Sequence, residues 1–132
     1  MAKGTCRWRV LIAEDDVLFA ATVDDFLTQE GFCVSMSSDG KVALEAAAKS
    51  HFDAVLTDLR MPNVDGATLI RRLRAERPML PVVVMSGHAP PDWQTTLQHE
   101  GEGPLLLLNK PVRMHALVHA LREVLGQQPT CQ

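Results

Sequence analysis

The sequence is poor in the features of membrane-spanning, nucleic-acid-binding and disulfide-rich chains. Its purely apolar runs, such as Leu105 to Leu108, are far too short to span a bilayer. No basic run indicates a nucleic-acid surface, and the net charge is only −3. The three cysteines are odd in number and form no Cys-x-x-Cys pair, so we expect no disulfide and no metal–cysteine site. We therefore expect a reduced, cytoplasmic protein with no direct contact to nucleic acid or membrane, in which Cys33 is a small buried hydrophobe.

The length favours one domain, since 132 residues with 46% hydrophobic content can bury a single core. Met1 to Cys6 lacks the apolar core of a signal peptide. We expect an N-terminal tail over 1–8, a domain over 9–126 and a C-terminal tail over 127–132. Because the last predicted helix ends near Leu125, we expect either a free-standing domain or one excised from a larger protein.

Strand-like and helical patterns alternate along the whole chain. Apolar, β-branched runs predict strands over 9–13, 32–36, 52–57, 82–85 and 105–108. Helical periodicity predicts helices after Asp16, over 39–49, from Asp65-Gly66 to before Pro78, and over 114–125, with a short fourth helix over 92–100. The first helix should have Asp16 as its N-cap and end at Gly31. Its apolar face is predicted to comprise Val17, Leu18, Ala21, Phe26 and Leu27.

This alternation predicts an α/β fold with a single five-stranded parallel sheet, doubly wound as (βα)5. Right-handed crossovers bring every strand-to-helix loop to one edge of the sheet, where ligands of such folds bind. The residues that follow the predicted strands at this edge are acids, a hydroxyl and a lysine: Glu14-Asp15-Asp16, Asp58, Ser86-Gly87 and Asn109-Lys110-Pro111.

Clustered carboxylates need a cation, because two of them about 4 Å apart repel by roughly 4 kcal/mol at an effective dielectric near 20. Oxygen ligands on a tight loop suit Mg²⁺, which takes one or two carboxylates. A carboxylate beside Mg²⁺ can attack a phosphoryl group, and the metal and Lys110 would then neutralise charge on its oxygens.

Four sequence blocks at these strand ends resemble the signature blocks of response-regulator receiver domains of two-component signalling. They are VLIAEDD, VLTDLRMPNVDG, VVVMSGHA and LLLLNKP, and the resemblance covers about Arg9 to Leu125. It implies the flavodoxin-like strand order 2-1-3-4-5. It also implies a partner, a sensor histidine kinase or a histidine phosphotransfer domain, and an unknown effector or output domain.

The resemblance implies a role for each residue at the edge. Asp58 would be the phosphoacceptor, Ser86 would hydrogen-bond a phosphoryl oxygen, and Lys110 would pair with the phosphate and precede a cis proline, Pro111. Mg²⁺ would be held by Asp15, Asp58 and the backbone carbonyl of Arg60, with Glu14 acting through water. Such a domain is a signalling module and not an enzyme in the usual sense, although self-catalysed phosphorylation and dephosphorylation are possible.

Some of these residues also have simpler structural explanations. Asp58 could be a turn residue, and Asp16 is better explained as an N-cap than as a metal ligand. Asp65-Gly66 is best explained as a turn before the third helix. A pseudo-receiver that signals without phosphorylation is the alternative function. A dinucleotide-binding enzyme is disfavoured, because it needs a Gly-rich turn where this chain has Glu14-Asp15-Asp16.

Four features lie outside these roles. Leu107 stands three residues before Lys110, where many receivers have an aromatic residue, so how the signal is read is open. His88 and Arg60 at the rim could tune water access to a phosphorylated Asp58. His115 and His119 could bind zinc but lack a visible third ligand, which favours a solvated or partner-facing surface. Trp93 is either an anchor for a partner or a packing residue.

Overall fold

The computed structural model describes residues 8–61, 63–87 and 103–126. The described elements are β1 Trp8–Ala13, α1 Val17–Gln29, β2 Phe32–Ser37, α2 Gly40–Lys49, β3 Ala54–Asp58, α3 Gly66–Glu76, β4 Val82–Ser86, β5 Leu105–Asn109 and α5 Met114–Gly126. Each predicted strand and helix in these ranges is present within a few residues of its predicted bounds. The fourth helix expected over 92–100, with Trp93, lies outside the described residues.

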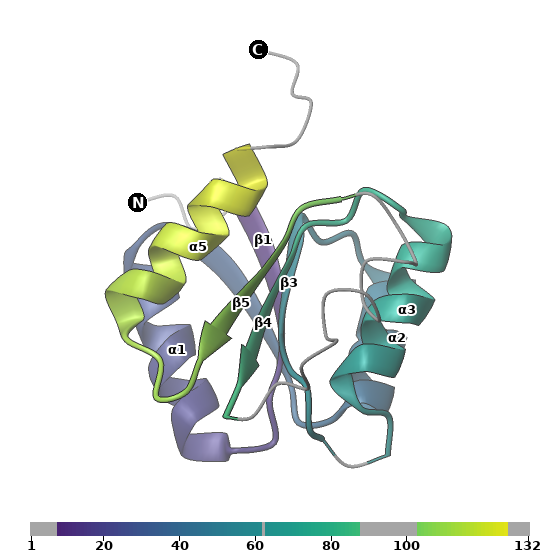
Figure 1. Cartoon of the computed structure of the whole chain (residues 1–132), viewed down its shortest axis with the longest axis horizontal. Coiled ribbons are helices and arrows are strands. Elements are labelled where there is room, and N and C mark those ends of the chain that lie inside the picture. Colours follow the sequence, from purple (N-terminus) through teal and green to yellow (C-terminus); the bar gives the residue numbers. More distant parts are fainter. Residues whose placement is uncertain (1–7, 62, 88–102, 127–132) are drawn as a thin grey trace.

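The five strands form one parallel sheet in the order β2-β1-β3-β4-β5, which confirms the predicted fold class. Helices α1 and α5 cover one face, and α2 and α3 cover the other (Figure 1). Alternate residues of β1 face opposite layers: Val10 and Ile12 pack with α1 and α5, whereas Leu11 and Ala13 pack with α2 and α3. The middle of each central strand is therefore apolar, as sheets covered on both faces require, and polar residues stand at the strand ends.

Helix α1 has the predicted ends but a different buried face. The Phe19 N–H donates to Oδ1 of the N-cap Asp16 at 3.1 Å, and Gly31 follows the helix with a φ of 99°.

The buried stripe of α1 is Ala20, Val23 and Leu27, at helical spacing. Val17 and Leu18 are 70% and 81% exposed, so the predicted apolar face was wrong for them. It was also wrong for Ala21, which is exposed. The first turn of α1 adjoins the carboxyl ends of the strands, and Val17 and Leu18 face solvent there.

Cys33 corrects a second expectation. It is half-buried on β2, which is an edge strand with a neighbour on one side only, and it is disulfide-bonded. Its partner lies outside the described residues. Among the described helices, none is both long and apolar enough to cross a membrane.

Candidate functional site

The chemistry-bearing residues gather where the strands end. Glu14 directly follows β1, Asp58 and Ser86 are the last residues of β3 and β4, and Lys110 directly follows β5. The register aligns these ends, since Ala13 lies opposite Thr57, Asp58 opposite Met85 and Ser86 opposite Asn109. Residues up to 96 positions apart in the chain therefore meet at one edge of the sheet.

Lys110 lies at the centre of this cluster. Its Nζ donates to Asp58 Oδ2 at 2.6 Å and to Glu14 Oε1 at 3.2 Å. Its backbone N–H donates to the Ser86 carbonyl at 2.9 Å, and the bond to Pro111 is cis, as predicted. The lysine is thus fixed from both its backbone and its side chain, and it faces Asp58.

The backbone around Asp58 holds its carboxylate in place. Asp58 is 8% exposed, and its Oδ1 accepts a hydrogen bond from the Arg60 N–H at 3.2 Å. The N-terminus of α3 approaches closely, because the Gly66 N–H donates to the Leu59 carbonyl at 2.8 Å. A Cβ on Gly66 would lie 2.0 Å from the Asp58 carbonyl oxygen, so only glycine fits there.

Glu14, Asp15 and Asp58 form an acidic cluster. One carboxylate oxygen from each lies within 4.8 Å of the other two. Glu14 is 2% exposed and its Oε2 accepts from the Asp16 N–H at 3.0 Å, whereas Asp15 is exposed. A set of carboxylate oxygens, open to solvent on the Asp15 side, fits a hard cation such as Mg²⁺.

The pKa values of Glu14 and Lys110 are shifted by this arrangement. Burial raises the pKa of Glu14, and the hydrogen bond from the Asp16 amide and the charge of Lys110 only partly oppose it. Burial alone would lower the pKa of Lys110, but the hydrogen bond and charge of Asp58, followed by those of Glu14, outweigh burial and raise it. Lys110 is therefore a cation at neutral pH.

The structure brings together most of the predicted site residues. Glu14, Asp58 and Lys110 are joined by hydrogen bonds, and Asp15 adjoins them. Ser86 is 2% exposed at the end of β4, and its backbone holds Lys110. The roles given to these residues, including that of the Arg60 carbonyl, stay predictions.

Phe19 is a site residue that the sequence reasoning missed. Its ring centroid lies 5.4 Å from Lys110 Nζ, close enough for a cation–π contact. The only signal in the sequence was an aromatic residue in the first turn after the acidic triplet Glu14-Asp15-Asp16. Two residues singled out in the sequence are not part of the described site. His88 lies outside the described residues, and Leu107 is half-buried and packs with the layer of α2 and α3.

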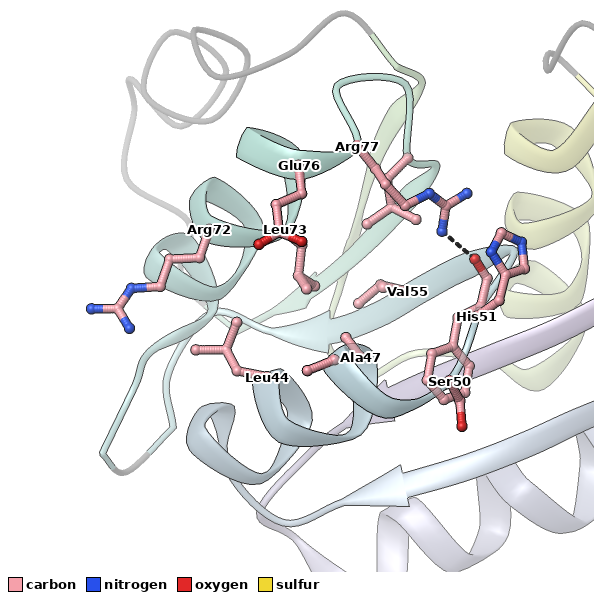
Figure 2. Close-up of a pocket in the computed structure, with 12 residues that line it drawn as sticks. Leu44, Ala47, Ser50, His51, Val55, Arg72, Leu73, Glu76 and Arg77 are labelled. Carbon is pink, nitrogen blue, oxygen red and sulfur yellow. Dashed lines mark hydrogen bonds between the residues drawn. The ribbon is translucent and has the colours of Figure 1, made fainter.

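A separate cavity of about 370 Å³ lies between α2 and α3 (Figure 2). Leu44, Val55 and Leu73 line its apolar part, and Arg77 at its rim donates to the Phe52 carbonyl. Because Phe52 precedes β3 and Arg77 precedes β4, this cavity lies toward the amino ends of the strands. It is therefore not part of the acidic site.

The fold and the acid–lysine cluster define a receiver-like α/β domain, and comparison with known proteins gives its family. Residues 10–122 match the response regulator receiver domain, so the chain belongs to this family. The resemblance predicted from the four sequence blocks is thereby confirmed.

Relatives include a response regulator receiver protein of Anaeromyxobacter sp. (38% identical, 79% of this chain and 43% of the relative). The transcriptional regulatory protein FixJ of Bradyrhizobium diazoefficiens is 26% identical over 93% of this chain and 59% of its own length. The chain thus spans about half the length of these two relatives.

Among solved structures, a response regulator receiver protein of Sinorhizobium medicae superposes with a TM-score of 0.80 at 30% identity, covering 91% of this chain and 95% of the other. The receiver domain of the sensor histidine kinase PA1611 from Pseudomonas aeruginosa, solved with a magnesium ion in its active-site cleft, has a TM-score of 0.78 at 24% identity, covering 91% and 98%. The second likeness shows the fold alone.

Proposed function

We propose that this receiver domain accepts a phosphoryl group on Asp58 in a Mg²⁺-dependent reaction, from the phosphohistidine of a sensor kinase or a histidine phosphotransfer domain. The observation that supports it most is the contact of 2.6 Å between Lys110 Nζ and Asp58 Oδ2, beside two further carboxylates. A turn residue would need neither a buried carboxylate nor a fixed ammonium. The family assignment agrees with this chemistry.

The residues present fit Mg²⁺. The ion would be held by the carboxylates of Asp15 and Asp58 and the Arg60 carbonyl, with Glu14 acting through water. When bound, it would supply positive charge against the phosphoryl oxygens. The short distances among the three acids support this set, since without a cation their charges would repel.

The chain's own residues would then perform the transfer. A carboxylate oxygen of Asp58 attacks the phosphorus, the new O–P bond forms as the N–P bond to the donor imidazole breaks, and the imidazole keeps the bonding electrons. Lys110 orients Asp58 before the attack and afterwards pairs with a phosphoryl oxygen. The Ser86 hydroxyl would donate to another of these oxygens.

The donor protein needs a surface to dock on beside Asp58. Val17 and Leu18 are exposed apolar residues that follow the acidic triplet directly. They would give a phosphohistidine-bearing protein apolar contact next to the carboxylates, which suits a cytoplasmic signalling partner. FixJ is named as a transcriptional regulatory protein, and an output through an effector is our corresponding expectation for this domain.

Intact-mass analysis after incubation with acetyl phosphate and Mg²⁺ tests the proposal. We expect one added phosphoryl mass in the wild type and in Asp25→Asn, a matched control on the exposed side of α1, and none in Asp58→Asn or after chelation of Mg²⁺. No adduct on the wild type, either from acetyl phosphate or from a phosphorylated kinase, would favour the pseudo-receiver alternative.

A further inference from the structure

Helix α5 carries a stripe of metal-binding side chains far from the acidic site. His115, His119 and Glu123 are spaced four residues apart, and all three are exposed. Residues at this spacing lie one turn apart on the same side of a helix, so two imidazoles there can reach one ion. The three residues line one shallow groove between α5 and the end of α1.

Glu123 lies beside the ring of His119. The His119 Nδ1 lies 3.9 Å from Glu123 Oε1, one turn further along the helix. A carboxylate facing Nδ1 favours the tautomer with its proton on that nitrogen, which leaves Nε2 as the free donor atom. Histidine ligands of metals commonly have such a carboxylate behind them. Glu123 thus has a role without coordinating the ion itself.

The ring of His115 is also restrained. It packs edge-on against Phe26 of α1, with centroids 5.7 Å apart and planes at 87°. Phe26 offers no competing hydrogen bond, so the ring nitrogens of His115 stay available for coordination. A ring held by such packing loses less conformational freedom on binding than a free ring would.

The remaining charges of the groove are balanced. Arg122 Nη2 pairs with Glu30 Oε1 at 3.1 Å, so the guanidinium is held toward α1 by an opposite charge. The carboxylate of Glu123 lies 3.9 Å from the His119 ring nitrogen, and its negative charge favours a cation there.

We propose that His115 and His119 bind a divalent cation that prefers imidazole, of the class of Zn²⁺, Ni²⁺ and Cu²⁺, with Glu123 positioning His119. Its two nitrogen donors distinguish it from the acidic site, whose donors are all oxygens and suit Mg²⁺. Water completes the coordination shell, because the helix supplies two of the four ligands that Zn²⁺ prefers. This site does not depend on phosphorylation of Asp58.

Titration calorimetry of the whole chain with Zn²⁺, in excess Mg²⁺ to occupy the oxygen site, tests the proposal. We expect His115→Ala and His119→Ala each to weaken zinc binding by more than about tenfold, and Glu123→Gln by about tenfold. His51→Ala is the matched control, because His51 is also exposed and also faces a carboxylate, that of Asp53. It should leave zinc affinity unchanged.

Amide NMR spectra identify the location of the zinc site independently of the calorimetry. Zinc should shift or broaden signals of α5 near His115 and His119 in the wild type, and these changes should vanish in His119→Ala. Phosphorylation of His119→Ala by acetyl phosphate should match the wild type, which separates this site from the proposed phosphoacceptor. Equal zinc affinity in the wild type, His115→Ala and His119→Ala would overturn the proposal.

Discussion

Gly66 is the residue whose substitution probes the site geometry most sharply. In Gly66→Ala the new methyl carbon would lie 2.0 Å from the Asp58 carbonyl oxygen and 2.7 Å from the Leu59 Cα. Favourable non-bonded carbon contacts lie at about 3.5–4.0 Å, so the start of α3 or the loop after Asp58 must move by at least about 1 Å. Both neighbours are backbone atoms, which no side-chain rotation can relieve.

Forcing extra volume into a packed site costs about 1–3 kcal/mol. The higher helix propensity of alanine recovers at most about 1 kcal/mol at an interior helix position, and less at the first residue of a helix. Because both clashes are with backbone atoms, the cost should fall in the upper part of this range, and after the recovery we expect Gly66→Ala to lower the free energy of unfolding by roughly 1–2 kcal/mol. The displaced Asp58 should also be phosphorylated more slowly by acetyl phosphate.

Urea denaturation measures the loss of stability. The comparison requires that the wild type and the variant have equal m-values. The matched control is Gly126→Ala at the end of α5, where a Cβ would meet nothing within 4 Å. We expect this control to be as stable as the wild type or slightly more so. If Gly66→Ala proves as stable as Gly126→Ala, then α3 does not approach Asp58 as closely as described.

Three further substitutions test other parts of the account. Lys110→Met should abolish or greatly slow phosphorylation, measured with radiolabelled donor, because it removes the ammonium that contacts Asp58 and Glu14; wild-type rates would contradict that role. Leu18→Ala should slow phosphotransfer from a cognate kinase and leave acetyl phosphate reactivity unchanged, and equal slowing with both donors would argue against docking. The hydrogen bond from the Val42 amide is the main cause that lowers the pKa of Asp39. The charged Asp39 should therefore stabilise the fold at pH values above its ordinary pKa near 3.8. This stabilisation should be lost as the pH falls through the lower pKa of the folded state. Urea midpoints of Asp39→Asn, which keeps a capping side chain, should therefore differ from the wild type near neutral pH and converge with it in acid; a constant difference at every pH would refute this.

The site could be predicted from the sequence because the carboxyl ends of parallel strands lie at one edge of the sheet. Asp58, Ser86 and Lys110 each end or follow an apolar run, and the crossover rule then brings them together without knowledge of packing. The strand order, by contrast, was implied only by the family resemblance, and the structure has that order. The N-cap role of Asp16 followed from local hydrogen bonding alone.

Other features depend on packing that a sequence pattern does not show. The first turn of α1 is apolar, yet Val17 and Leu18 are exposed because the buried stripe begins at Ala20. Arg74 is polar but fully buried, since its guanidinium donates to the carbonyls of Leu80 and Pro104, which the fold brings together.

Chemical mapping of the modified residue tests the central claim most directly. An aspartyl phosphate is an acyl phosphate, which borohydride reduces to homoserine with release of phosphate. After phosphotransfer, reduction and peptide sequencing by mass spectrometry, the account predicts homoserine at position 58 and nowhere else. Homoserine at position 15 or 65, or a phosphorylated chain that yields none, would contradict it.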